Sequence, residues 1–87
     1  MNSKHRKILA LIFETPIRSD VRWDDVEKLF KGFGAEIVEG NGSRVRIALN
    51  GVKVVFHRPH PKKVTDKGAL VVVRKFLIKA GINHDEI

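Results

Sequence analysis

Residues 44–58 read RVRIALNGVKVVFHR, and this stretch decides the fold. Two runs rich in β-branched residues flank Asn50-Gly51, a dipeptide that favours a two-residue type I′ turn because both positions accept positive φ. A two-residue turn also sets the register of the hairpin. The predicted register joins apolar residues in pairs: Leu49 with Val52, Ile47 with Val54, and Val45 with Phe56.

The other face of this predicted hairpin is more polar. The register places Ala48 opposite Lys53, Arg46 opposite Val55, and Arg44 opposite His57. Because opposed residues on one face of an antiparallel pair lie close together, we expect Arg44 and His57 to be direct cross-strand neighbours.

The segments before the hairpin predict two helices and a strand. Residues 3–13 and 24–33 carry apolar residues at helical spacing, with Leu11 on the buried face of the first helix. Gly34 is expected to end the second helix. Residues 35–38 then form a short strand.

The segment after the hairpin predicts a loop and a third helix. Proline cannot join a strand ladder, so the Pro-His-Pro run at residues 59–61 must leave the sheet. The helix begins near Thr65 or Asp66, either of which can cap it, and ends at Gly81. Arg74 is expected to point away from the core.

The expected order of elements is α-α-β-β-β-α, and the fold class is α+β. We expect a three-stranded antiparallel sheet with the helices on one face and the opposite face open to solvent or a ligand. The chain has 87 residues, against ~100–200 in a typical domain, so we expect one domain over residues 1–87.

The net charge of +7 is unevenly distributed. Residues 1–39 contain seven basic and seven acidic residues, whereas residues 40–82 contain ten basic residues and one acid. A basic half beside a neutral half is typical of proteins that bind a polyanion. We favour a nucleic acid over a membrane surface because the basic residues do not follow one amphipathic helix. The alternative is a soluble basic surface with no specific partner.

Composition excludes several classes of protein. Without cysteine there are no disulfides, no cysteine-ligated zinc and no thiol catalysis. A small chain without disulfides is expected in the cytoplasm. No stretch approaches the ~18 apolar residues of a membrane helix, so we expect no membrane partner. No acidic or histidine cluster has metal-ligand spacing, so we expect neither a metal nor a cofactor.

Three lysines surround the start of the last predicted helix: Lys62, Lys63 and Lys67. Backbone N–H groups and the positive end of the helix dipole favour phosphate at such a position. Double-stranded RNA-binding domains also have three antiparallel strands followed by a helix, and they contact phosphates from this region. We therefore expect these lysines to bind the RNA backbone.

Two histidines, His57 and His60, are candidates for proton transfer in the basic half. RNA cleavage needs one group to take the 2′-hydroxyl proton and another to protonate the leaving oxygen, and histidine titrates in the right range. Arg44, Arg46 or Arg58 would stabilise the charge on the phosphate. The alternatives are that His57 is a bystander and that His60 only shapes the turn.

Several of these motifs together resemble one known family. The matching features are Gly42-Ser43, the hairpin, the Pro-His-Pro run, Gly68 and the helix end Lys79-Ala80-Gly81-Ile82, with residues 23–29 and 34–36 upstream. Over about residues 20–82 the chain resembles the HicA toxins of bacterial toxin–antitoxin systems, with residues 3–13 as an extra N-terminal helix. The resemblance implies a double-stranded RNA-binding-like fold, ribosome-independent mRNA interferase activity and a HicB-type antitoxin that masks the toxin.

The chain departs from the family at an important position. The family usually has a histidine, taken as catalytic, directly after Gly-Ser, and this chain has Arg44 there; it also has Ala69 where the family often has threonine. Three possibilities follow: His57 transfers the proton instead, His60 does so, or the chain binds RNA without cutting it. We rank His57 first because crossing a strand pair moves a side chain by only ~5 Å.

The expected function is therefore that of an mRNA endoribonuclease, independent of metals, with His57 or His60 transferring protons. The expected RNA-binding residues are Arg44, Arg46, Lys53, Arg58, Lys62, Lys63 and Lys67. The alternatives are a non-catalytic RNA-binding relative and a protein-interaction module that docks on an acidic partner.

Overall fold

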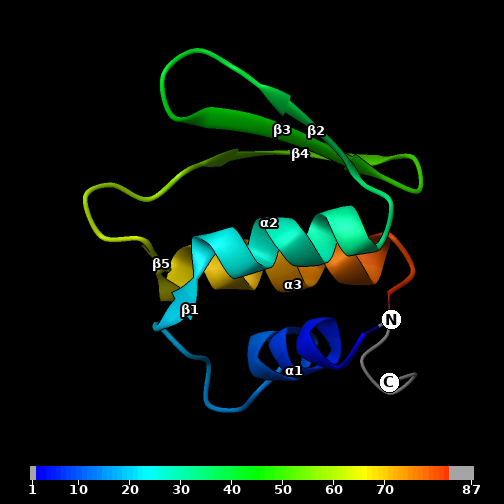
Figure 1. Ribbon diagram of the computed structural model, residues 1–87, viewed down its shortest axis with the longest axis vertical. Coiled ribbons are helices and arrows are strands. Elements are labelled where there is room, and N and C mark those ends of the chain that lie inside the picture. The colour runs from blue at the N-terminus through cyan, green and yellow to red at the C-terminus, as the bar shows by residue number, and fades with distance from the viewer. Residues whose placement is uncertain (1, 83–87) are drawn as a thin grey trace.

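The computed structural model describes residues 2–82 of the chain (Figure 1). Its elements, in chain order, are α1 (Ser3–Ile12), β1 (Val21–Arg22), α2 (Trp23–Gly32), β2 (Glu36–Glu39), β3 (Arg44–Leu49), β4 (Val52–His57), β5 (Val64–Thr65) and α3 (Lys67–Lys79). The expected α+β class is confirmed, with a three-stranded antiparallel sheet in the order β2-β3-β4.

The hairpin of β3 and β4 has the register that its turn predicts. Every expected pair is present, from Leu49 opposite Val52 to Arg44 opposite His57. Asn50 has a φ of 50° and Gly51 a φ of 83°, as a type I′ turn requires. The alternation of the sequence therefore becomes an alternation of faces, with the odd-numbered positions of β3 buried.

The helices all lie on one side of the sheet. In Figure 1, α2 and α3 lie between the sheet and α1, so the molecule has a sheet layer, a layer of two helices and a further helix below them. Among residues 2–82, no other helix or strand covers the face of the sheet turned away from the helices. This open face is the one that the sequence assigned to solvent or a ligand.

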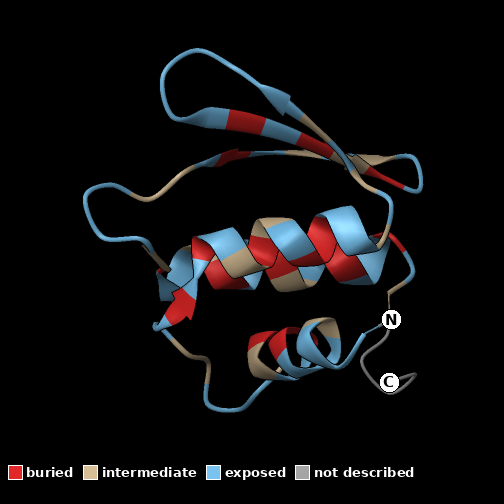
Figure 2. Cartoon of the chain, in the orientation of Figure 1, coloured by how far each residue is buried: buried red, intermediate tan, exposed pale blue. Residues whose placement is uncertain are grey.

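Aromatic rings join the sheet to the two central helices. Phe30 of α2 is fully buried; its ring lies 6.1 Å from that of Phe56 in β4 and 5.4 Å, edge-on, from that of Phe76 in α3. Trp23 adds a tilted contact with Phe56 at 5.1 Å. Figure 2 shows the buried residues on the surfaces that these layers turn toward one another. Burial of such rings supplies much of the hydrophobic stabilisation of the fold.

The first helix completes the core, and two details differ from the sequence-based expectation. Leu9, not Leu11, is one of its buried residues, because α1 presents that side to α2 and α3. Arg74 does not point away: its guanidinium donates to the backbone carbonyls of Ile12 and Glu14. These carbonyls lie at and just beyond the C-terminal end of α1, so Arg74 ties α1 to α3.

A second, two-stranded sheet was not predicted. Val21 pairs with Thr65 and Arg22 with Val64, which brings the start of α2 beside the start of α3. Thr65 is therefore a buried strand residue and does not cap the helix. Asp66 does so, and its carboxylate accepts a hydrogen bond of 2.8 Å from the backbone of Ala69. Strands of two residues are too short to leave a periodic pattern in the sequence.

The hairpin turn also contacts the end of α3. The Asn50 side-chain amide donates to the carbonyl of Ala80 at 2.7 Å, across 30 residues of sequence. This carbonyl belongs to the C-cap residue of α3, where backbone acceptors lack partners within the helix. Asn50 therefore has two roles: its backbone adopts the positive φ of the turn, and its side chain donates a hydrogen bond to the end of α3.

Replacing Asn50 by glycine should separate these two roles. Asn50→Gly keeps the positive φ but removes the bond to Ala80, so the free energy of unfolding should fall by about 1 kcal/mol in urea denaturation. Asn41→Gly controls for the backbone entropy that a glycine adds to the unfolded chain, since Asn41 is exposed and its side chain makes no hydrogen bond within residues 2–82. Equal losses in the two variants would show that backbone entropy, and not the bond, accounts for the effect.

Candidate nucleic-acid interface

The open face of the sheet carries exposed side chains from all three strands. They alternate with the buried ones and comprise Glu36, Val38, Arg44, Arg46, Lys53, Val55 and His57. Three of these are permanent cations and one is a carboxylate, so the face is basic overall. The sheet thus presents a cationic surface on strands whose other side is fixed by the core.

Arg44 and His57 face each other where β3 begins and β4 ends. Both are exposed, and they form a non-hydrogen-bonded pair, because the backbone N–H of Arg58 donates to the carbonyl of Ser43 one step further along, at 2.9 Å. In such pairs the Cα atoms are about 4.5 Å apart and the side chains are at their closest. The register therefore places an arginine and a histidine directly opposite each other on the open face.

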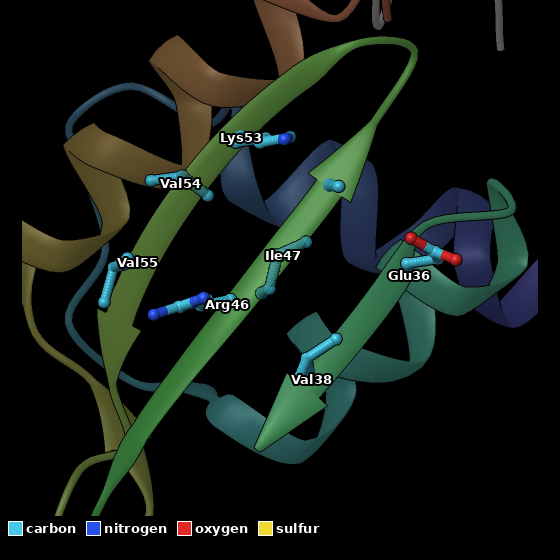
Figure 3. Close-up of a pocket in the computed structure, with 8 residues that line it drawn as sticks. Glu36, Val38, Arg46, Ile47, Lys53, Val54 and Val55 are labelled. Carbon is cyan, nitrogen blue, oxygen red and sulfur yellow. The ribbon is translucent and has the colours of Figure 1, made fainter. Parts of the chain in front are cut away.

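A shallow hollow lies beside this pair. Figure 3 shows Arg46 extending from β3 toward Val55 of β4, with Val38 on the neighbouring strand β2. Val38 and Val55 are the register partners of Arg46 on either side, and each is about half exposed. Lys53 lines the same hollow. The cations of this face therefore stand among aliphatic side chains, with both charge and apolar surface available to a ligand.

The remaining candidates lie away from the three-stranded sheet. His60, Lys62 and Lys63 are exposed in the loop between β4 and β5, and Lys67 is the first residue of α3. His60 follows the end of β4, so it lies outside the strand register that places Arg44 opposite His57. One N–H at the start of α3 is already bound by the carboxylate of Asp66, which leaves the three lysines as the main cationic feature there.

Arg58 stands at the centre of an ion-pair network. Its Nε and Nη2 donate to Glu27 at 2.8 and 3.0 Å, and its Nη2 also donates to Glu39 at 2.7 Å. The indole N–H of Trp23 donates to the same Glu27 carboxylate. The network joins α2, the end of β2 and the segment directly after His57.

The network engages most of the Arg58 guanidinium. Four hydrogen bonds run from it to the two carboxylates, against five N–H groups in the side chain. Its bonds to Glu27 and Glu39 raise the pKa of Arg58 above its ordinary value, and Arg58 in turn lowers the pKa of Glu39. Arg58 therefore has little free capacity for a phosphate. Sequence could not reveal this, because its partners are 31 and 19 residues away.

Glu27→Gln should test how much the network stabilises the fold. The change leaves Arg58 beside an uncharged amide at a site where the glutamate side chain is only 13% exposed, so we expect a loss of about 2 kcal/mol in the free energy of unfolding. Glu14→Gln is the matched control, since Glu14 pairs with Arg18 but is 46% exposed. Its stability should change much less. Similar losses in both would contradict a special role for the network.

Glu39 should add a pH-dependent contribution to stability. Because Arg58 lowers its pKa, the folded state favours ionised Glu39; the gain is complete above the ordinary pKa of 4.5 and is lost as the pH falls through the lower folded-state value. Glu39→Gln should therefore be less stable than the wild type at pH 7, and the difference should vanish in acid. Urea denaturation between pH 7 and pH 3 measures it. Glu36→Gln, at an exposed glutamate of the same strand, is the control variant measured beside it.

Residues 2–82 contain neither a cluster of metal ligands nor a membrane-spanning helix. No group of three or more histidine and acidic side chains in this part of the chain is placed to hold a metal ion. Among the same residues, no helix is both long and apolar enough to span a membrane.

Comparison with known proteins gives one match. The model of a family described as the HicA toxin of bacterial toxin–antitoxin systems matches residues 23–82, from the start of α2 to just beyond α3. No curated protein and no solved structure gives a significant match. The matched span is well over half of the chain and contains the open sheet face, the Arg44–His57 pair and the Pro-His-Pro loop. The chain therefore belongs to the HicA toxin family.

Proposed function

We propose that this chain is a toxin that cleaves mRNA, acts in the cytoplasm and is neutralised by a HicB-type antitoxin. Membership of the toxin family supports the biological class. The observation that carries the proposed chemistry is the Arg44–His57 pair, an exposed imidazole directly across the strands from an exposed guanidinium. RNA cleavage needs a group that takes the 2′-hydroxyl proton and a cation that stabilises the phosphate, and this pair offers one of each; a second group must protonate the leaving oxygen.

The proposed reaction needs no metal and no cofactor. His57 takes the proton of a 2′-hydroxyl, the oxygen attacks the adjacent phosphorus, and the bond from phosphorus to the 5′-oxygen breaks. The leaving oxygen receives a proton from a second acid, for which the imidazolium of His60 is the alternative to water. Arg44 binds the phosphate and balances the charge that develops on its oxygens. The products are a 2′,3′-cyclic phosphate and a 5′-hydroxyl.

Other cations would hold the RNA backbone. Arg46 and Lys53 lie on the same open face as the pair, and Lys62, Lys63 and Lys67 extend the basic surface past the β4–β5 loop. Contacts of this kind bind phosphates without reading sequence, and their affinity falls as salt rises. In this proposal Arg58 has a different role: its carboxylate partners hold the end of β4, and hence the backbone of His57.

A non-catalytic RNA binder is the second candidate. One observation favours it: Arg44 occupies the position at which the resembled family usually has its histidine. In that case the open face would bind RNA with strong salt dependence and leave the strand intact.

Incubation of purified protein with a structured mRNA in EDTA should distinguish the candidates. We expect scission in EDTA by the wild type and a loss of about 10²–10⁴-fold in rate for His57→Ala, as removal of a general acid–base group predicts. His60→Ala is run beside it. Lys7→Ala is the control, because Lys7 is an exposed residue of α1, the helix that Figure 1 shows separated from the sheet by α2 and α3.

The outcomes identify the group that acts. Full activity in His57→Ala with loss in His60→Ala would transfer the role to His60. Intact RNA with a clear gel shift would show that the protein is a non-catalytic RNA binder. The variant Arg44→His would then show whether a histidine at this position restores cleavage. Absence of both scission and RNA affinity would overturn the proposal and favour a protein-interaction module.

A further inference from the structure

A groove runs between β4 and α3 along the edge of the sheet that is formed by β4. Its apolar lining includes Val54 from β4 and Val72, Phe76 and Ile78 from α3. Figure 3 shows Val54 on β4 with the ribbon of α3 beside that strand. Val72 is 42% exposed and Ile78 is 61% exposed, although the other face of α3 is buried in the core. We call this feature the β4–α3 groove.

The β4 side of the groove is a strand edge with unused hydrogen-bonding groups. β4 is the last strand in the order β2-β3-β4. The two-residue turn makes Val52, Val54 and Phe56 the residues that bond to β3, so the N–H and C=O groups of Lys53 and Val55 point outward. Within residues 2–82 no backbone hydrogen bond from another element reaches them. Such an edge is a template for a further strand.

The charges around the groove indicate which kind of peptide segment could pair with this edge. Its charged lining residues are all lysines: Lys53 from β4, and Lys75 and Lys79 from α3. No carboxylate lines it. An extended segment that alternates acidic and aliphatic side chains would pair with these lysines and cover the exposed Val72 and Ile78. RNA fits less well, since the walls are aliphatic and offer no exposed ring on which a base could stack.

We propose that the β4–α3 groove is the docking site of an acidic, extended segment of the antitoxin, which adds a fourth strand beside β4. The proposal rests on the toxin–antitoxin function proposed above. It also gives docking a consequence for activity. His57 lies four residues after Lys53 on the same strand, about 13 Å away at 3.3 Å per residue. A segment that continued along β4 would therefore cover the proposed proton-transfer group.

Binding of a purified, full-length HicB-type antitoxin tests the proposal by calorimetry. Ile78→Glu should weaken binding at least tenfold, and Lys75→Glu together with Lys79→Glu should weaken it further and make it less dependent on salt. Val71→Glu is the matched control: Val71 is an exposed valine of α3 that does not line the groove. RNA affinity and cleavage by Ile78→Glu should equal those of the wild type, and thermal melting confirms that each variant is folded.

Amide hydrogen exchange of the complex supplies a second, independent measurement. Strand addition should slow exchange at Lys53 and Val55 at least tenfold on antitoxin binding, whereas docking through side chains alone would leave these amides unchanged and overturn the fourth strand.

Four results would overturn the docking site, and they have different consequences. If all groove variants bind the antitoxin with wild-type affinity, the groove is not the docking site, and the proposed function is unaffected. An antitoxin that does not bind the wild-type toxin would overturn both proposals. Loss of RNA affinity instead of antitoxin affinity would assign the groove to RNA. A wild-type dimer that Ile78→Glu converts to a monomer in sedimentation would assign it to a second copy of the chain.

Discussion

The two-residue turn at Asn50 and Gly51 sets the register of β3 and β4, and both faces of the sheet follow from it. A slip of one residue would turn Val45 and Ile47 out to water and bring lysine and arginine against the helices. The same turn anchors the end of α3 through the Asn50 amide. Register, core and the position of the open face are thus consequences of one local constraint.

The arginines of the basic half illustrate how the fold gives one residue type different tasks. Arg44 and Arg46 are on the open face, where their charge is available to a ligand. Arg58, one residue beyond the sheet, is bound by Glu27 and Glu39. Arg74 donates hydrogen bonds to backbone carbonyls at the C-terminal end of α1. Net charge therefore overstates the number of cations that a polyanion can meet, since two of these four are engaged inside the molecule.

Two surfaces of β4 are available for different partners. Its open face carries Lys53, Val55 and His57, and its free edge carries backbone groups next to an apolar groove. An RNA would use the first surface and an added strand the second. Because both surfaces belong to one short strand, a protein that pairs with the edge is bound within reach of the open face. This arrangement would link antitoxin binding to inhibition without any change in the shape of the toxin.

The sequence alone determined the features that depend on neighbours along the chain: the helices, the turn, the hairpin register and hence the pairing of Arg44 with His57. These follow from short-range sterics and alternation. Only the tertiary structure decided the β1–β5 pairing, the burial of Leu9, the anchoring role of Arg74 and the network around Arg58. The partners in those interactions are 19 to 62 residues apart, apart from Trp23 and Glu27, which are four residues apart, and from α1, whose buried side depends on what it packs against. Interactions of that range leave no local pattern, because packing of the whole chain brings the partners together.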